Sequence, residues 1–219
     1  MSVMSVPAAG YWRSHARTWR SFYARGGLRP GALVARFVAS RQRALEGLLA
    51  AGTGTETLID VGCGSGEVLA ALRPRVGRAI GIDLSRPLLE LARAECPQAP
   101  LAEADAHHLP FPDGAGHIIL AVGLLDYVER PRRVLAELAR ATAPGGRVLL
   151  TYPQRPSPFW WLRRGWGARL RWWLFRLPPI QNAVTWGELQ QALSAAGLVV
   201  RSHRSLWGAS WLVEAERPA

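Results

Sequence analysis

The sequence has no lysine and only two cysteines, and these shortages exclude several kinds of site. All 27 basic residues of the 219-residue chain are arginine. A phosphate-binding P-loop requires a lysine, so ATP hydrolysis by that motif is excluded. Cys63 and Cys96 are too few for a disulfide framework or a cysteine-rich zinc site. We therefore predict no bound metal and expect a reducing, cytoplasmic environment.

Long apolar runs are also missing. No stretch of about 18 uncharged apolar residues could span a bilayer. The first residues lack the basic start and long apolar segment that a secretory signal needs. We expect a protein that is neither secreted nor membrane-spanning, and its length favours a single α/β domain with a sizeable core.

Positive charge is concentrated in two segments of this strongly basic chain, whose formal net charge is +11. Residues 1–51 hold eight arginines against one acid, and residues 154–180 hold six against none. Residues 52–153 hold ten against twelve, and residues 181–219 three against three. GC-rich coding could explain why the basic residues are arginine, but it would act equally on the middle of the chain. The two positive segments indicate a surface that meets an anion, although a solvated basic face is the simpler alternative.

Short β-branched runs alternate with helix-forming segments along the chain. We predict strands at residues 57–61, 78–82, 118–123, 146–152, 198–204 and 207–214. We predict helices at residues 29–50, 67–72, 85–95, 131–142 and 185–196, with Ser85 as the cap of the third. This alternation predicts a doubly wound α/β fold with a mostly parallel sheet and helices on both faces. Residues 1–51 are interpreted as an N-terminal helical segment of the same domain.

A glycine-rich loop, Asp60-Val-Gly-Cys-Gly-Ser-Gly66, follows the first predicted strand. Its glycines permit positive φ and let backbone N–H groups approach a ligand, because no Cβ stands in the way. A dinucleotide-binding loop would have glycine at position 67, where this chain has Glu67, so NAD binding is disfavoured. Right-handed crossovers should bring Asp83, Asp105 and Val122 to the same crevice.

Residues 58–69, with their glycine loop, resemble the first signature motif of class I S-adenosylmethionine-dependent methyltransferases. Three later stretches resemble further parts of that family in order and spacing: Gly81-Ile-Asp-Leu-Ser85, Ala104-Asp105-Ala106 with Leu109-Pro-Phe-Pro-Asp113, and Gly123-Leu-Leu-Asp-Tyr-Val-Glu-Arg-Pro131 through Pro144-Gly-Gly146. The last of these is similar to the branch that modifies quinones and other small molecules. The resemblance covers about residues 55–153, and its order continues to the end of the chain.

The resemblance implies a Rossmann-like, seven-stranded fold that binds S-adenosylmethionine. Residues 52–219 would form the methyltransferase domain, with a helical substrate cap at residues 154–180 after the fifth strand. The implied cofactor-binding residues are Asp60, Gly62, Gly64, Gly66, Asp83, Leu84, Asp105, Ala106 and Gly123. Asp83 would bind both ribose hydroxyls. Leu84 would lie beside the adenine, and Asp105 would bind the adenine amine. Taken singly, each aspartate could instead be a strand-end, cap or turn residue.

Asp126 and Tyr127 follow the fourth predicted strand, where members of the family often have a residue that faces the substrate. We predict that these two are the catalytic residues. His107 and His108 are alternative bases, although such a pair is more commonly at the surface. Cys63 is interpreted as a small side chain that fills the glycine turn. The sulfonium already activates the methyl group, so the enzyme mainly aligns the acceptor and accepts a proton.

The predicted cap is rich in tryptophan and arginine. Helical spacing predicts a basic amphipathic helix over residues 159–177, and Trp160, Trp161, Trp172 and Phe175 lie off its apolar face. The helix could pack on the protein's own core. Tryptophan beside arginine is also typical of a lipid–water interface.

We predict methyl transfer to a hydrophobic small molecule or lipid-like acceptor. An anionic membrane surface is a second predicted partner, with the protein on the inner membrane face of the cytoplasm. An RNA or other nucleic-acid methyltransferase is an alternative, because arginine and aromatic side chains can track phosphates and stack bases. It is disfavoured because Gly123-Leu-Leu-Asp126 replaces the Asn/Asp-Pro-Pro-Tyr element that nucleobase amino-methyltransferases share. A non-catalytic cofactor-binding adaptor is a further alternative, disfavoured by the intact cofactor motifs.

Overall fold

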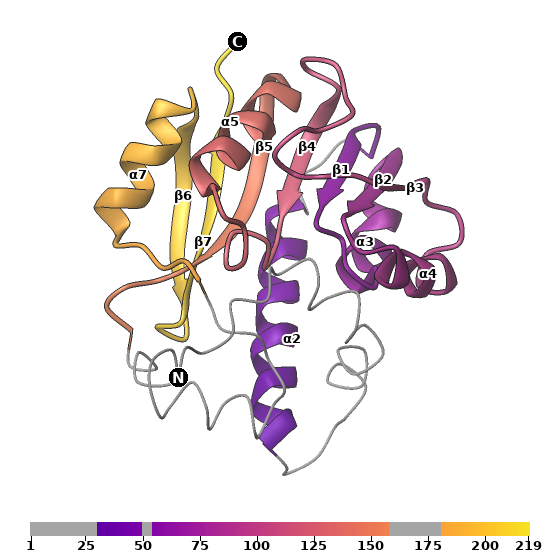
Figure 1. The fold of residues 1–219 in the computed structure, drawn as a ribbon, viewed down its shortest axis with the longest axis horizontal. Helices are drawn as coiled ribbons and strands as arrows, with labels where there is room; N and C mark the ends of the chain where they lie inside the picture. The colour runs from indigo at the N-terminus through magenta and orange to yellow at the C-terminus, as the bar shows by residue number, and fades with distance from the viewer. Residues whose placement is uncertain (1–29, 50–53, 158–180) are drawn as a thin grey trace.

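The computed structural model describes residues 30–49, 54–157 and 181–219 (Figure 1). The elements in chain order are α2 (Pro30–Leu49), β1 (Thr57–Val61), α3 (Glu67–Leu72), the 3-10 turn η1 (Arg73–Arg75), β2 (Arg78–Asp83), α4 (Arg86–Glu95), β3 (Leu101–Glu103), β4 (Gly116–Ala121), α5 (Pro131–Ala141), β5 (Thr142–Pro153), α7 (Trp186–Ala195), β6 (Val199–Leu206) and β7 (Ser210–Glu216). Most of the predicted cap, including the helix expected at residues 159–177, lies outside the described residues.

The strands form one seven-stranded sheet in the order β3-β2-β1-β4-β5-β7-β6. Strands β1 to β5 pair in parallel, whereas β7 is antiparallel to both β5 and β6. The chain winds outward from β1 to β3 and then returns to β4 on the other side of β1. Ligands of open α/β sheets bind outside the carboxyl ends of the strands at such a reversal. The prediction of a doubly wound, mostly parallel seven-stranded fold is confirmed.

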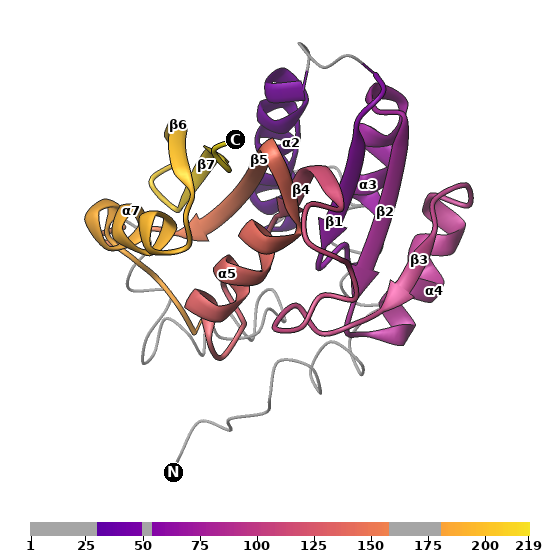
Figure 2. The same cartoon turned by 90° about the horizontal axis from the view of Figure 1, so that it is seen from above.

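Apolar side chains on both faces of the sheet explain why helices cover both faces. Within β4, Ile118 and Leu120 pack in the core beneath α2 and α3, while Ile119 and Ala121 pack beneath α5. This alternation follows from the two-residue period of a strand, and burial on both faces is typical of parallel strands. Figure 2 shows α2 and α3 on one side of the sheet and α5 and α7 on the other.

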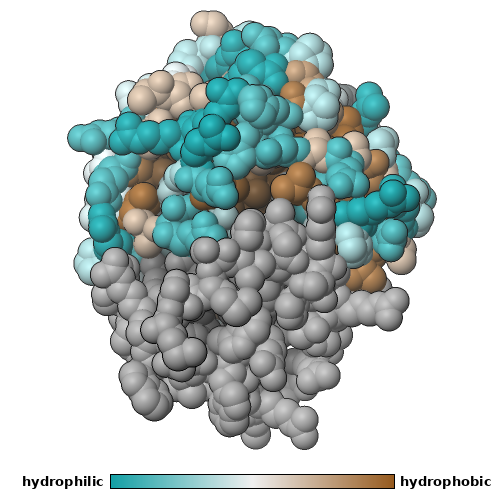
Figure 3. Space-filling view, in the orientation of Figure 1, coloured by the Kyte–Doolittle hydropathy of each residue, from teal (hydrophilic) through white to brown (hydrophobic). Residues whose placement is uncertain are grey.

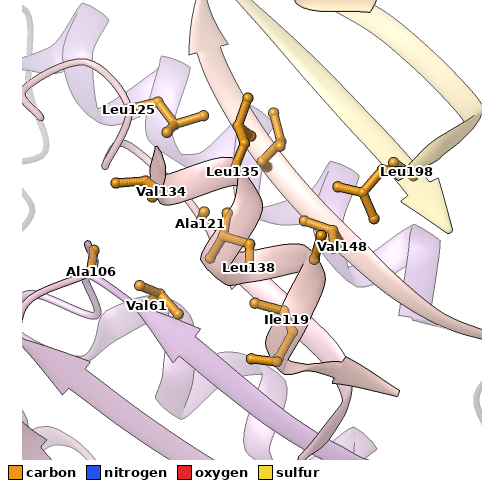
Figure 4. Packing of buried hydrophobic residues seen from close by; sticks show 14 of the residues in the cluster. Val61, Ala106, Ile119, Ala121, Leu125, Val134, Leu135, Leu138, Val148 and Leu198 are labelled. Carbon is orange, nitrogen blue, oxygen red and sulfur yellow. The ribbon is translucent and has the colours of Figure 1, made fainter. Parts of the chain in front are cut away.

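Helix α5 supplies much of the second core layer. Figure 4 shows its side chains Val134, Leu135 and Leu138 beside Ile119 of β4 and Val148 of β5. All five are at most 1% exposed. Each buried aliphatic side chain contributes about 1.5–3 kcal/mol through loss of water contact. This packing fixes α5 against the strand whose carboxyl end enters the candidate site.

Helix α2 is fixed to the sheet by apolar packing and by two arginines. Leu45 is fully buried in the core that α2 shares with α3. The last turn of a helix leaves carbonyl groups without intrahelical partners. Arg147 donates to one of these carbonyls, that of Leu48, at 3.1 Å, and Arg204 donates to the carbonyl of Ala44, one turn earlier, at 2.9 Å. The helix is therefore held at its carboxyl end by residues of β6 and β5.

Several predicted boundaries were wrong for local reasons. Strand β3 was missed because three residues carry no usable alternation. Strand β5 begins at Thr142, not at position 146, because its pairing with β4 jumps from Thr142 to Arg147 over an irregular segment. Trp207 and Gly208, at φ 54° and 67°, form the turn before β7, so the last strand does not begin at Trp207.

The coloured part of the surface in Figure 3 is mainly hydrophilic, with apolar residues showing between the polar ones. Within the described ranges, no helix combines the length and the apolar character needed to cross a membrane.

Candidate functional site

The glycine loop lies at the carboxyl end of β1 and is tied to β2. The N–H groups of Gly62 and Cys63 both donate to the carbonyl of Ile82, at 2.8 and 2.9 Å. Gly62, Gly64 and Gly66 have φ values of 75°, 56° and 88°, a region that favours glycine. The sequence motif thus forms the tight turn that was predicted from its residues.

The three glycines of the loop serve different purposes. A Cβ on Gly62 would lie 2.9 Å from Leu124, and one on Gly66 would lie 3.0 Å from the Cα of Ala92 in α4. These two glycines allow close packing within the protein. A Cβ on Gly64 would meet nothing within 4 Å. The backbone of Gly64 therefore faces open space in which a ligand could lie.

The Asp83 carboxylate joins this loop to the end of β2. One oxygen accepts from the N–H of Gly64 at 2.9 Å, and the other accepts from the N–H of Ser85 at 2.8 Å. Burial raises the pKa of Asp83, although the hydrogen bonds from Ser85 and Gly64 oppose the shift. A carboxylate has about four acceptor positions, so two backbone bonds leave capacity for ligand hydroxyls.

The residues beside Asp83 differ in exposure. Leu84 is 38% exposed, which is unusual among the large apolar side chains described. Ser85 is at the N-cap position of α4, as predicted, but its side chain makes no capping hydrogen bond. The nearby Asp83 carboxylate takes the Ser85 N–H, and the Ser85 hydroxyl oxygen is buried without a hydrogen-bond partner in the described structure.

The predicted adenine loop follows β3 and is already tightly bonded. Asp105 Oδ1 accepts from the N–H of His107 at 2.9 Å and lies 2.7 Å from its Nδ1. Partial burial raises the pKa of Asp105, but the bonds and charge of His107 outweigh this effect and lower it. Ala106 is 8% exposed and packs in the core near Val61 (Figure 4). The backbone of Ala106 is thus better placed than its side chain to meet a ligand.

Helix α5 fixes the position of this loop. Arg133 donates to the carbonyl of His107 at 3.2 Å, and Glu137 accepts from the N–H of Leu109 at 2.9 Å. Arg140 pairs with Glu137 and donates to the carbonyl of Phe111 at 2.8 Å. His107 therefore belongs to a hydrogen-bond network, which favours a structural role over the alternative role as a base.

The predicted catalytic residues lie on the loop after β4, and residues distant in the sequence brace this loop. Gly123 donates its N–H to the Thr151 hydroxyl at 2.8 Å. The Asn182 amide donates to the carbonyls of Leu125 at 2.9 Å and Val128 at 2.7 Å, on both sides of Asp126 and Tyr127. The sequence analysis missed Asn182 because no local motif marks it.

Asp126 also lies close enough to Tyr152 to affect its ionisation. Burial, followed by the charge of Asp126, raises the pKa of Tyr152 to about 12. Tyr152 is 4% exposed and therefore stays neutral in the core. It provides a buried wall next to the predicted catalytic loop.

Asp60, one residue before the end of β1, is in an environment that is unfavourable for a carboxylate. It is 2% exposed, and its Oδ2 has no hydrogen-bond partner in the described structure. Burial, then the negative charge of Asp83, raises its pKa to about 7, while Arg41 of α2 lowers it. Sequence reasoning assigned Asp60 to the cofactor site but missed Arg41, which precedes the recognised motifs.

Cys63 fills the underside of the glycine loop. It is 7% exposed, and its sulfur lies 2.9 Å from the position of a Cβ on Gly81. Burial and the charges of Asp60 and Asp83 raise the pKa of its thiol far above the usual range. A thiol that does not ionise is a poor nucleophile, which agrees with its interpretation as a space-filling residue. No cluster of three potential metal ligands occurs in the described part of the chain.

The sequence is similar to known methyltransferases over its central part. Residues 59–150 match the family described as methyltransferase domain. Demethylmenaquinone methyltransferase of Thermus thermophilus is 35% identical over 125 residues, which are 53% of this chain and 56% of that protein. An uncharacterized 37.1 kDa protein in a transposon of Streptomyces fradiae is 38% identical over 108 residues, 47% of this chain and 31% of that protein. The chain thus spans about half or less of the length of these relatives.

Solved structures show the same fold. Magnesium protoporphyrin IX methyltransferase from Synechocystis with bound S-adenosylmethionine has a TM-score of 0.75 at 15% identity, covering 99% of this chain and all of that one. Geranyl diphosphate C-methyltransferase from Streptomyces coelicolor has a TM-score of 0.65 at 18% identity, covering 83% of this chain and 80% of that one.

Residues 59–150 thus match a methyltransferase domain family, and the fold is that of solved S-adenosylmethionine-dependent methyltransferases. These matches confirm the predicted fold and support the methyltransferase family and the S-adenosylmethionine cofactor that the sequence predicted. The roles of the individual site residues stay predictions.

The Asp60 environment predicts an unusual dependence of stability on pH. Its folded-state pKa of about 7 lies above the ordinary value, so the folded protein holds the proton more tightly and stability is lost as the pH rises between about 4 and 7. Relative to Asp60→Asn, the wild-type free energy of unfolding should fall by up to about 4 kcal/mol over this range. Urea unfolding of both proteins at several pH values measures these free energies of unfolding. Glu90→Gln, at an exposed position of α4, is the control. Parallel pH profiles for wild type and Asp60→Asn would contradict the prediction.

Proposed function

We propose that the protein transfers a methyl group from S-adenosylmethionine to a hydrophobic small molecule. The observation that carries the proposal is the glycine loop at the switch point, where the open space at Gly64 adjoins the Asp83 carboxylate and the exposed Leu84. The names of similar proteins support an apolar acceptor, since they refer to a menaquinone precursor, a porphyrin and geranyl diphosphate.

In this proposal the crevice holds the cofactor along the carboxyl ends of β1, β2 and β4. Asp83 accepts from the ribose hydroxyls, and Leu84 covers the adenine with apolar surface. Asp105 accepts from the adenine amine through Oδ2, because its described hydrogen bonds go to Oδ1. The remaining assigned residues shape the crevice mainly through their backbone or border it: Asp60, Gly62, Gly64, Gly66, Ala106 and Gly123.

The bound cofactor supplies a methyl group that its sulfonium has already activated. The protein therefore needs to orient the acceptor, exclude water and take up a proton where the acceptor releases one. Asp126 and Tyr127 are proposed for these tasks because they follow β4, at the same edge of the sheet as the glycine loop and Asp83. Asn182 acts as a positioning residue that holds their loop at both sides.

The cofactor assignment predicts that Asp83→Ala weakens binding of S-adenosylhomocysteine by about 1.5–3 kcal/mol. The reason is the loss of charge-assisted hydrogen bonds to two hydroxyls. Titration calorimetry measures the affinity, and Glu90→Ala on the exposed side of α4 should bind like the wild type. An unchanged affinity of Asp83→Ala would remove Asp83 from the cofactor site. Failure of the wild type to bind would reject the proposed function.

The catalytic assignment predicts a different pattern for Asp126→Asn and Tyr127→Phe. Each should lower methyl transfer by at least about tenfold while the affinity for S-adenosylhomocysteine changes less than about twofold, because the loop faces the acceptor. Transfer is measured as labelled methyl incorporated into a solvent extract of cells that lack the protein. Asn182→Ala should lower transfer in the same way by loosening the loop. Equal losses of cofactor affinity would show that these residues are placed wrongly.

We further propose that the protein collects its acceptor at an anionic membrane surface. The support is in the sequence: the arginine-rich segments at 1–51 and 154–180 and the tryptophans at 160, 161 and 172. Arginines near an anionic surface contribute about 1 kcal/mol each and are screened by salt, whereas the apolar contribution of tryptophan is not.

Vesicle sedimentation tests the membrane proposal. The wild type should pellet with anionic vesicles and only weakly with neutral ones. A variant with Trp160, Trp161 and Trp172 changed to Ala should pellet less at every salt concentration. Tight binding to RNA without binding to vesicles would overturn the proposal and favour the nucleic-acid alternative.

A further inference from the structure

A tryptophan is exposed in a turn whose geometry disfavours it. The β6–β7 hairpin (Figure 1) turns through Leu206-Trp207-Gly208-Ala209, and the N–H of Ala209 donates to the carbonyl of Leu206 at 2.9 Å. Trp207 and Gly208 both have positive φ, 54° and 67°, as in a type I′ turn. Such turns favour Asn-Gly, because a bulky side chain is strained at positive φ. Trp207 is 45% exposed, so neither the turn nor the core explains a tryptophan at this position.

The turn lies at the edge of the sheet that holds the candidate site. Strand β7 is antiparallel to β5, and Ser210 at its start pairs with Pro153 at the carboxyl end of β5. Among the described residues, three large apolar side chains are exposed: Leu84, Val199 and Trp207. Leu84 and Trp207 are at the carboxyl edge, whereas Val199 begins β6 at the opposite edge. Two of the three are thus at the edge where the acceptor is proposed to react.

Helix α2 holds the exposed tryptophan in place. The rings of Trp207 and Phe37 meet edge to face, with centroids 5.8 Å apart and planes at 80°. Phe37 is itself partly buried on the core that α2 shares with α3. The N–H of Gly208 also donates to the Ser205 hydroxyl at 3.2 Å, which fixes the turn. An apolar group held in this way loses little conformational freedom when it binds a partner.

Arginines without acidic partners lie near the aromatic pair. Arg36 precedes Phe37 in α2, and Arg43 follows two turns later; both are exposed. Arg204 of β6 donates to a carbonyl of α2. Within the described ranges, none of these three arginines has an ion pair. The one acid of α2 already pairs with an arginine of η1. Uncompensated positive charge beside an exposed aromatic side chain fits an anionic partner.

We propose that this surface, formed by Phe37, Trp207 and the three arginines, docks on an anionic lipid bilayer, with the indole of Trp207 at the level of the headgroups. The inference rests on the proposed function, because it names the part of the catalytic edge that would meet the lipid. It is separate from the tryptophans at 160, 161 and 172, which lie outside the described residues.

The size and chemistry of the surface favour a bilayer over a protein partner. Tryptophan is enriched at lipid–water interfaces, where its amphipathic ring sits among the headgroups. Exposed arginines add an attraction to anionic lipid that salt screens. Each partner of a stable protein complex buries about 800 Å², which is far more than one tryptophan can offer. Shallow insertion into lipid needs only a small apolar tip.

A fluorescent label at the turn tests the insertion directly. Cys63 and Cys96 are the only cysteines of the chain, and both are buried. Trp207→Cys would therefore carry a thiol-reactive, environment-sensitive dye at one exposed position. Vesicles of phosphatidylcholine and phosphatidylserine should shift its emission to shorter wavelength and raise the intensity at least about twofold. The same dye on Val199→Cys, at a position 46% exposed, should not respond.

A matched pair of substitutions tests whether the indole contributes to binding. Trp207→Asn keeps a residue that tolerates positive φ. It should lower the affinity for these vesicles at least about fivefold at every salt concentration, because the lost contribution is apolar. Val199→Asn should bind like the wild type. Arg36→Gln should lower the affinity only at low salt. All three variants should keep the wild-type affinity for S-adenosylhomocysteine, which shows that the domain is folded.

The outcomes separate this inference from the proposals on which it rests. Vesicle binding by the wild type with no spectral change at position 207 would overturn the inference and leave the membrane proposal standing, since another surface would then dock. Equal losses in Trp207→Asn and Val199→Asn would overturn it too. RNA binding that Trp207→Asn abolishes, without vesicle binding, would assign the surface to nucleic acid instead. Methyl transfer itself is decided separately, by whether the wild type binds S-adenosylhomocysteine.

Discussion

The shape of the candidate cofactor site depends on one carboxylate, that of Asp83, which accepts hydrogen bonds from two different segments. Asp83 accepts a hydrogen bond from the glycine loop after β1 and another from the start of the segment that leads into α4. The distance between β1 and β2 is set by the sheet, but the path of the loop above them is not. By holding Gly64 at 2.9 Å, Asp83 fixes the side of the crevice where backbone N–H groups and open space meet. The proposed ribose-binding residue thus also shapes its own site.

The strength of this arrangement lies in its use of backbone groups. Two N–H groups bound to the carbonyl of Ile82 and one bound to Asp83 hold the loop without any long side chain. Gly62 and Gly66 then let Leu124 and Ala92 pack directly against the loop. A site made in this way has little conformational freedom to lose when a ligand binds.

The sequence predicts those parts of the site whose residues are adjacent in the chain. The glycine loop, Asp83 and the loop after β4 each follow a strand, and strand order alone brings them to one edge. The buried strands were found because β-branched and apolar residues are clustered there. β3 and the start of β5 were missed because pairing with a neighbouring strand, and not local composition, determines their extent.

The residues that sequence reasoning missed act across long separations in the chain. Asn182 binds carbonyls of residues more than fifty positions earlier, and Arg41 reaches β4 from a helix before the first strand. Backbone carbonyls accept hydrogen bonds whatever their side chains are, so a contact such as that of Asn182 leaves no pattern at the accepting positions. Only the packed fold reveals such partners.

The attachment of α2 has a thermodynamic consequence for the domain. The helix is held at its carboxyl end by Arg147 and Arg204, and further toward its start it carries Arg41. Arg41 carries this helix to Gly123 after β4, at the edge of the sheet where the cofactor is proposed to bind. Ligand present at a hundred times its dissociation constant stabilises the state that binds it by about 2.7 kcal/mol. The concentration of the cofactor would then help to determine how firmly the amino-terminal helix stays docked on the domain.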